Sequence, residues 1–339
     1  MITCCLNAAI FGVLSATSKI IYAIIQTLCA IQETMKVQLF IIFFLTTLLT
    51  GHPSKKDVLL DITKKYLPDN YSVLKNYDAS TVDFLAREDS LQDYFLNYPT
   101  IIHEAFHVFG FTINSPFDND SLYRYRLNDT LTIAVRKFKS IPSRQIDKSI
   151  SIRDKKLLFA YDTYINSIDS NHVTQQNGFI GLLEEYTASF QSLKAYTVSY
   201  NFLRDSFGWN NPRIWIKYLS NSGSDTYSTN QFKLFISWYL QYCKTHNPDL
   251  YKRITGDKNI RSLYTHIETH SQELIKTFLI NRIEILNRLK PFTIREDIYI
   301  KLKSDLSFGY GIDDHIKNLE LTDSLLRKPE HTILNALRQ

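Results

Sequence analysis

Residues 179–207 read FIGLLEEYTASFQSLKAYTVSYNFLRDSF, and this stretch decides the fold class. Its apolar residues recur at i, i+3 and i+4, which is the spacing of a helix that buries one face in a core. The same spacing recurs over most of the chain, in the ranges 57–66, 91–109, 151–168, 230–244 and 259–289. Two segments, 131–138 and 298–302, have the composition of strands. The sequence therefore predicts a mainly α fold, with an α+β fold containing a small sheet as the alternative.

The composition argues against several classes of protein. The chain has 339 residues, of which 44% are hydrophobic and 22% charged, so it has enough apolar side chains for a folded core. It contains only 10 glycines, and neither GxGxxG nor GxxxxGK[ST] occurs, which argues against dinucleotide and P-loop nucleotide binding. The net charge is +5 without a long basic run, so we expect no nucleic-acid partner.

The first 51 residues have the character of a leader. Met35 and Lys36 precede an uncharged, mostly apolar run over 37–49 and a polar exit, the arrangement of a secretory signal peptide over 35–51. For the apolar residues 1–34 two interpretations stay open: translation begins at Met35, which we favour, or residues 6–31 form a membrane anchor. We therefore expect a secreted or periplasmic protein, with a membrane-anchored one as the alternative and membrane contact only through an uncleaved leader.

The cysteines agree with removal of this leader. Three of the four lie within it, and Cys243 is the one that remains, so the mature chain cannot form an internal disulfide. Its core must therefore hold it together without a covalent link. We expect a catalytic domain over residues 52–290 and a C-terminal extension over 291–339 that packs on it.

The chemistry is indicated by His103-Glu104-Ala105-Phe106-His107, an HExxH sequence within an apolar helical segment. Histidines four residues apart project from one face of a helix, so both imidazoles can bind one ion. Zinc accepts imidazole nitrogens and, in catalytic sites, keeps one position for water. Glu104 is placed to hydrogen-bond that water and to act as a general base. The alternative is a pair of core histidines that are hydrogen-bonded to their neighbours.

This segment resembles the active-site helix of the zincin metallopeptidases, which carries HExxH. The metzincin branch needs a further histidine three residues after a glycine, but here Ile113 follows Gly110 at that distance, so this branch is excluded. The gluzincin branch takes its third ligand from a glutamate on a later helix, and the stretch 178–189 offers Glu184 and Glu185. The resemblance implies a zincin-like helical metallopeptidase domain with one zinc ion (Zn²⁺) per chain.

Glu185 is the glutamate we prefer as the third ligand. Its helical face carries the small residues Gly181, Ala188 and Ser189, which would let this helix approach the HExxH helix closely. Gluzincin ligand segments often place a small residue three positions after the glutamate, as Ala188 does here. We expect Glu184 to support the site or to face solvent. Some gluzincins have an aspartate where this chain has Ser189, so the residue that orients a histidine stays unassigned.

A zinc hydrolase also needs a donor for the developing oxyanion. His172 lies in a polar loop that leads into the helix of Glu185, and we expect it to supply this donor. Tyr161, Tyr164 and Tyr186 are alternatives, and a loop histidine bonded to backbone or water is the simpler interpretation of His172.

These observations together predict an exported, zinc-dependent peptidase. His103, His107 and Glu185 would bind zinc, Glu104 would be the general base, and the partner would be a peptide or protein substrate. Neither a GxSxG sequence nor a cysteine-protease signature is present, which argues against serine and cysteine hydrolases. Two alternatives stay open: a zincin-like metal-binding protein without turnover, and a membrane-tethered helical protein in which the HExxH sequence arose by chance.

Overall fold

The computed structural model describes residues 54–338, except for 79–81, 83–95 and 114–121. The chain divides into two units, Met1–Ser54 and Lys55–Gln339, and the second is the one described below. The leader over residues 1–51, with its signal-peptide and anchor interpretations, lies outside the described residues. No helix in the described part of the chain is both long and apolar enough to cross a membrane.

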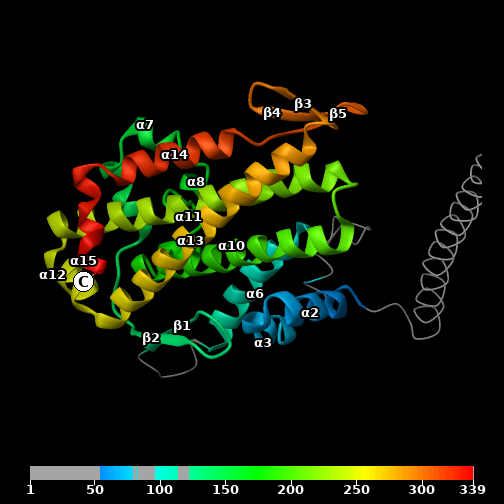
Figure 1. Cartoon of the computed structure of the whole chain (residues 1–339). Coiled ribbons are helices and arrows are strands. Elements are labelled where there is room, and N and C mark those ends of the chain that lie inside the picture. Colours follow the sequence, from blue (N-terminus) through cyan, green and yellow to red (C-terminus); the bar gives the residue numbers. More distant parts are fainter. Residues whose placement is uncertain (1–53, 79–81, 83–95, 114–121, 339) are drawn as a thin grey trace, which may run out of the picture. The chain divides into compact units, whose positions relative to one another are not determined.

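The described part is mainly helical and contains two small antiparallel sheets, which confirms the predicted fold class at this level (Figure 1). The longer helices are α2 (Lys55–Tyr66), α6 (Tyr98–Ile113), α10 (Phe179–Phe207), α11 (Pro212–His246), α12 (Pro248–Gly256), α13 (Lys258–Leu289) and α14 (Asp314–Leu326). The shorter helices are α3 (Tyr71–Lys75), α7 (Ile152–Lys155), α8 (Tyr161–Tyr164), α9 (Val173–Gln176) and α15 (Asn335–Arg338), with the 3-10 helices η1 (Pro68–Asn70), η2 (Ser143–Ser149) and η3 (Pro329–Leu334). The strands are β1 (Leu122–Arg126), β2 (Thr132–Arg136), β3 (Thr293–Glu296), β4 (Tyr299–Leu302) and β5 (Asp305–Gly311).

Helix α10 lies at the centre of this unit. It has the bounds that the sequence predicts, and 20 of its 29 residues are buried. It packs against α6, α11 and α13, so most of its circumference is enclosed by other helices (Figure 1). A helix with neighbours on several sides needs buried residues around more than one face, which explains its broad apolar pattern.

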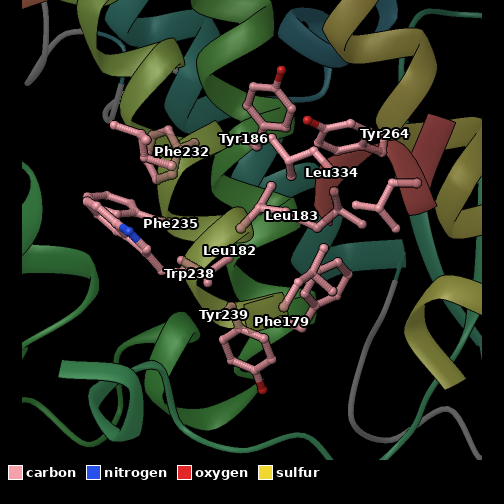
Figure 2. Packing of buried hydrophobic residues seen from close by; sticks show 14 of the residues in the cluster. Phe179, Leu182, Leu183, Tyr186, Phe232, Phe235, Trp238, Tyr239, Tyr264 and Leu334 are labelled. Atoms are coloured by element: carbon pink, nitrogen blue, oxygen red, sulfur yellow. The ribbon is translucent and has the colours of Figure 1, made fainter. Parts of the chain in front are cut away.

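Two apolar clusters share α10. The first surrounds its N-terminal half, where Tyr186 packs against Tyr264 of α13, and it includes Phe235 and Trp238 of α11, which pack against each other (Figure 2). The second surrounds its C-terminal half and includes α2, α6 and the beginning of α11. Because α10 passes through both clusters, burial on both sides fixes its position relative to α6, and this relationship defines the functional site.

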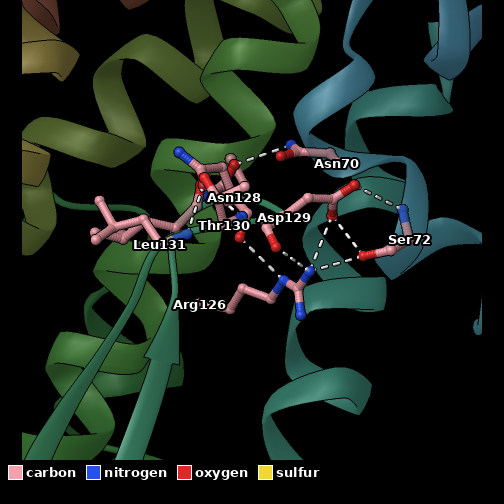
Figure 3. A network of polar contacts seen from close by, with 9 residues as sticks. Asn70, Ser72, Arg126, Asn128, Asp129, Thr130 and Leu131 are labelled. Atoms are coloured by element: carbon pink, nitrogen blue, oxygen red, sulfur yellow. Dashed lines mark hydrogen bonds and ion pairs between the residues drawn. The ribbon is translucent and has the colours of Figure 1, made fainter.

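The β1–β2 hairpin is anchored to the N-terminal helices. Arg126 Nη2 donates hydrogen bonds to the backbone oxygen of Asp129, at 2.9 Å, and to Ser72 Oγ at the beginning of α3, at 2.8 Å (Figure 3). The backbone N–H of Asp129 donates to the carbonyl oxygen of Asp69 at 2.6 Å. These bonds fix the strand that carries Tyr123, a residue that contacts the functional site.

Both strands that the sequence predicts are present. The segment 131–138 contains β2, which pairs with β1 in a register from Leu122↔Arg136 to Arg126↔Thr132. The segment 298–302 contains β4, the central strand of the order β3-β4-β5. Strands β1, β3 and β5 were not predicted. After the second sheet, α14, η3 and α15 pack on α11 and α13.

The single helix predicted over 151–168 is wrong, because only the short helices α7 and α8 form there. Side chains of α11 take over hydrogen bonds that a helix would make internally. The hydroxyl of Tyr227 donates to the carbonyl oxygen of Leu157, and Gln231 Oε1 accepts the N–H of Ala160 at 3.1 Å. The apolar residues of this segment therefore enter the core from turns and short helices, and not from one continuous helix.

Helix α11 is longer than the predicted range 230–244, since it begins at Pro212. Its first half contains polar residues that the periodicity does not identify as helical. The hydroxyls of Ser222, Thr226 and Thr229 each donate to the carbonyl oxygen four residues before, which lets them lie inside a helix.

Candidate metal centre

Helices α6 and α10 bring together the three residues that the sequence predicts as zinc ligands. His103 and His107 lie on successive turns of α6, and Glu185 lies in the second turn of α10. One potential ligand atom from each residue lies within 4.8 Å of the others, so the three form a potential metal-binding triad. Glu185 is buried and the two histidines are half-buried.

The triad has dimensions that suit a single zinc ion. His107 Nε2 lies 3.1 Å from His103 Nε2 and 3.3 Å from Glu185 Oε2, and His103 Nε2 lies 3.8 Å from the same oxygen. Bonds of about 2.0–2.1 Å in a tetrahedral zinc site place neighbouring ligand atoms about 3.3 Å apart. The observed separations are close to that value.

The hydrogen bonds around the triad direct lone pairs toward its centre. His107 Nδ1 lies 3.3 Å from Glu184 Oε1, a carboxylate oxygen that accepts, so neutral His107 carries its proton on Nδ1. The backbone of Ala188 lies beside His103 and favours its protonated form, and we assign this contact to Nδ1 because Nε2 faces His107. Glu185 Oε2 is buried and makes no hydrogen bond of acceptable geometry. A cation would compensate these converging lone pairs.

The pKa values also indicate that a positive charge stabilises the triad. Burial opposes the charged form of His107, but its close contacts with the carboxylates of Glu184 and Glu185 outweigh this and raise its pKa well above the ordinary value. Burial lowers the pKa of His103 to about 4. Burial also opposes the charge of Glu185, yet the contact with His107 outweighs it and lowers the pKa. In the metal-free chain a proton on His107 thus balances Glu185, and a metal ion would replace that proton.

Glu184 holds His107 from outside the triad. One of its carboxylate oxygens contacts His107, and the hydroxyl of Tyr123 donates to the other. Carboxylates commonly orient metal-binding histidines in this way. Ser189 makes no such contact, because its hydroxyl bonds Thr229 of α11 at 2.8 Å. Tyr123 was missed by the sequence analysis, since strand β1 was not recognised and the chain has 21 tyrosines.

The expected column of small residues facing α6 is wrong for two of its three members. A Cβ atom on Gly181 would lie 2.4 Å from the carbonyl oxygen of Val173, so this glycine accommodates α9. Ser189 faces α11, and of the three residues only Ala188 lies beside the HExxH helix, with its backbone next to His103. The HExxH helix also extends beyond the end of the predicted range 91–109, because α6 continues to Ile113.

Glu104 lies beside the triad and is half-buried. Burial raises its pKa, the charge of His107 opposes the shift, and the charge of Glu185 adds to it. Burial and the charge of Glu104 also raise the pKa of Tyr77 to about 12. Glu104 is thus within electrostatic reach of both the triad and the N-terminal helices, but it does not line the cleft that opens beside the triad.

A cleft of about 1110 Å³ opens beside the triad. His107, Glu184 and Glu185 contribute to it from α6 and α10. The segment 137–140, directly after β2, and the segment 171–177, which contains α9, supply further lining residues.

His172, the predicted oxyanion donor, lines this cleft and is close enough for its charge to act on Glu185. Its Nδ1 lies 3.3 Å from the N atom of Thr174 and 3.0 Å from Thr174 Oγ1 at the beginning of α9. Because both contacts use Nδ1, Nε2 is the ring nitrogen available to a ligand. The structure therefore brings His172 to the cleft, as expected, without testing its role.

Of the three alternative tyrosines, Tyr164 lies at the site. It lies close enough to Glu185 for that carboxylate to raise its pKa further, beyond the effect of burial, and its ring packs edge-on against His172 with the centroids 5.3 Å apart. Tyr161 donates its hydroxyl to Asp147 instead, and Tyr186 packs in the core against Tyr264.

No protein-family model, curated protein or solved structure matches this chain. The resemblance to zincins therefore stays a prediction from the HExxH sequence. The class of protein must be inferred from the site itself: a helical protein with a potential His₂Glu metal centre at the edge of a large cleft.

Proposed function

We propose that this protein is a zinc-dependent peptidase of the gluzincin type. The observation that carries the proposal is the convergence of His103 Nε2, His107 Nε2 and Glu185 Oε2 at separations of 3.1–3.8 Å. Three protein ligands of this kind leave a fourth position for water, which distinguishes catalytic from structural zinc sites. The support of His107 by Glu184 agrees with a site built to hold a metal.

Zinc bound here would supply a Lewis acid and lower the pKa of its water toward neutrality. Glu104, directly after His103, would accept the proton of the attacking water, and its raised pKa makes it a stronger base than an ordinary glutamate. His172 would donate a hydrogen bond from Nε2 to the oxygen that gains negative charge. Tyr164, which lies beside Glu185, is the alternative donor.

The cleft supports a peptide or protein as the substrate. At about 1110 Å³ it is slightly larger than the usual range of small-molecule pockets, so an extended segment of several residues can enter beside the triad. Export belongs to the same proposal and rests on the sequence of residues 35–51 alone.

A metal-binding protein without turnover is the second candidate. It is favoured by one observation: Glu104 is not among the residues that line the cleft. The two candidates share the metal centre and differ only in whether a water at that centre is activated.

The deciding experiment compares the full chain with Glu104→Gln, both loaded with zinc, on a mixed library of quenched fluorescent peptides. We expect one zinc per chain and a rate that falls by about 10²–10⁴-fold in the variant, since the general base is lost. Glu273→Gln, which changes an exposed glutamate of α13, is the matched control. Equal rates at equal zinc content would contradict the peptidase proposal, and zinc far below one per chain would contradict both candidates.

A further inference from the structure

The acidic side chains that line the cleft contact a neighbouring histidine, whereas the two lining lysines have no ion-pair partner among the described residues. Glu184 and Glu185 both line the cleft, and each contacts His107 at 3.3 Å, so both carboxylates are engaged at the triad. Lys137 and Lys139 line the cleft as well, and neither forms an ion pair within the described part of the chain. Lys137 is half-buried and Lys139 is exposed. Among the described residues that line the cleft, the charged side chains without an ion-pair partner are therefore the two lysines.

The lysines belong to a wall that is fixed relative to the triad. Phe138, between them, packs on the first apolar cluster and lies beneath the guanidinium of Arg253, 5.2 Å from its ring centroid. Ser140 Oγ accepts the N–H of Phe179 at 3.0 Å, which ties this wall directly to the first turn of α10. Helix α10 also carries Glu185, so the distance between the lysines and the metal centre is set by the core.

The segment 171–177 offers no competing acidic charge. The residues with which it lines the cleft are Asn171, His172, Val173, Gln176 and Asn177, which are neutral or, for the histidine, positive when protonated. A bound metal ion would add further positive charge beside His107. An acidic group in the cleft would therefore meet attraction without an opposing carboxylate on that side.

We infer that this cleft selects peptides carrying an aspartate or glutamate near the bond to be cleaved, and that Lys137 and Lys139 bind this carboxylate. The inference rests on the proposed function, because it takes a peptide as the occupant of the cleft. An ammonium group offers three rotatable donors and binds a carboxylate through charge-assisted hydrogen bonds. Because Lys139 is exposed, the selectivity is moderate and decreases with ionic strength.

The test measures binding separately from cleavage. Labelled peptides that differ only by glutamate or glutamine at one position are titrated into the zinc-loaded full chain carrying Glu104→Gln, and fluorescence anisotropy is recorded. We expect the glutamate peptide to bind about threefold to tenfold more tightly at one or two positions. The double substitution Lys137→Gln/Lys139→Gln should bring this ratio to about one. Lys244→Gln/Lys252→Gln removes the same charge from exposed positions outside the cleft lining and should keep the preference.

Equal affinity for both peptides at every position would overturn the inference. A preference that survives Lys137→Gln/Lys139→Gln, or one that is lost equally in the control, would overturn it as well. Cleavage of the same peptides by the wild-type chain reports on the proposed function. Cleavage without an acidic preference rejects the lysine site alone, whereas a lysine-dependent preference without cleavage rejects the peptidase and retains the acidic-peptide site.

Discussion

Glu184 and His107 are joined by a 3.3 Å contact between Oε1 and Nδ1, and this contact gives two adjacent glutamates different tasks. Glu185 directs Oε2 to the centre of the triad, where it lies 3.3 Å from His107 Nε2. The same imidazole is therefore held by one glutamate on each of its nitrogens. Tyr123 completes the arrangement by donating to the second oxygen of Glu184.

Glu184→Gln should weaken zinc binding by about 10–100-fold while leaving the fold intact, because the amide orients His107 less strongly than a carboxylate. Glu185→Gln should weaken zinc binding further, because a ligand is lost. Competition with a chelator of known affinity measures both constants, with the exposed Glu273→Gln as the control. An unchanged affinity in Glu184→Gln would show that this contact does not support the metal centre.

The two histidines could be found in the sequence because their spacing is local, four residues apart on one helix. Glu185 was preferred through the gluzincin resemblance and a column of small residues, of which only Ala188 lies beside α6. The contributions of Tyr123 and Lys137 could not be found, since they depend on a hairpin that is positioned by tertiary contacts such as that of Arg126 with Ser72. The role of Glu184 was left between two interpretations because a pattern does not show which way a side chain turns.

The fold likewise has parts that the sequence predicts and parts that depend on tertiary contacts. Helix α10 has its predicted bounds because its pattern is continuous from Phe179 to a glycine at position 208. The segment 151–168 has similar spacing but no helix of that length, because Tyr227 and Gln231 of α11 satisfy its backbone groups instead. Periodicity predicts which residues are buried more reliably than it predicts the backbone that buries them.

Gly181→Ala should destabilise the protein by about 1–3 kcal/mol, because overpacking a close contact forces the backbone to move. The new Cβ would lie 2.4 Å from the carbonyl oxygen of Val173 and push α9, and with it His172, away from α10. Urea unfolding measures the loss. Gly256→Ala, at a helix position with no other atom within 4 Å of the new Cβ, should be neutral or slightly stabilising. Equal stability of the two variants would contradict the close approach of α9.

Asp225→Asn should alter the pH dependence of stability. Burial raises the pKa of Asp225 to about 7, although the hydrogen bond from Ser192 opposes the shift. The folded state thus keeps a proton that the unfolded state releases, so wild-type stability falls as the pH rises from about 4 to about 7 and is level above that.

Because asparagine cannot ionise, the variant should gain about 2–4 kcal/mol relative to the wild type over this pH range. Urea unfolding of both metal-free proteins, at about pH 4.5 and about pH 7.5, measures the difference. Asp162→Asn, at an exposed position, should show no such gain. A constant difference between Asp225→Asn and the wild type at both pH values would mean that Asp225 ionises normally in the folded protein.

Glu268 joins the C-terminal helix α15 to the core. Its side chain is 6% exposed and lies 3.2 Å from Lys233 Nζ, while Arg338 of α15 donates to both of its carboxylate oxygens. Glu268→Leu should destabilise the protein by about 3–5 kcal/mol, because the Lys233 side chain, 8% exposed, would then be buried without a counter-ion. The half-exposed Arg338 can turn to water. Lys233→Met/Glu268→Leu should therefore be more stable than Glu268→Leu alone, and urea unfolding of the four proteins in this double-mutant cycle measures the coupling. Strictly additive effects would show that Lys233 and Glu268 do not stabilise each other.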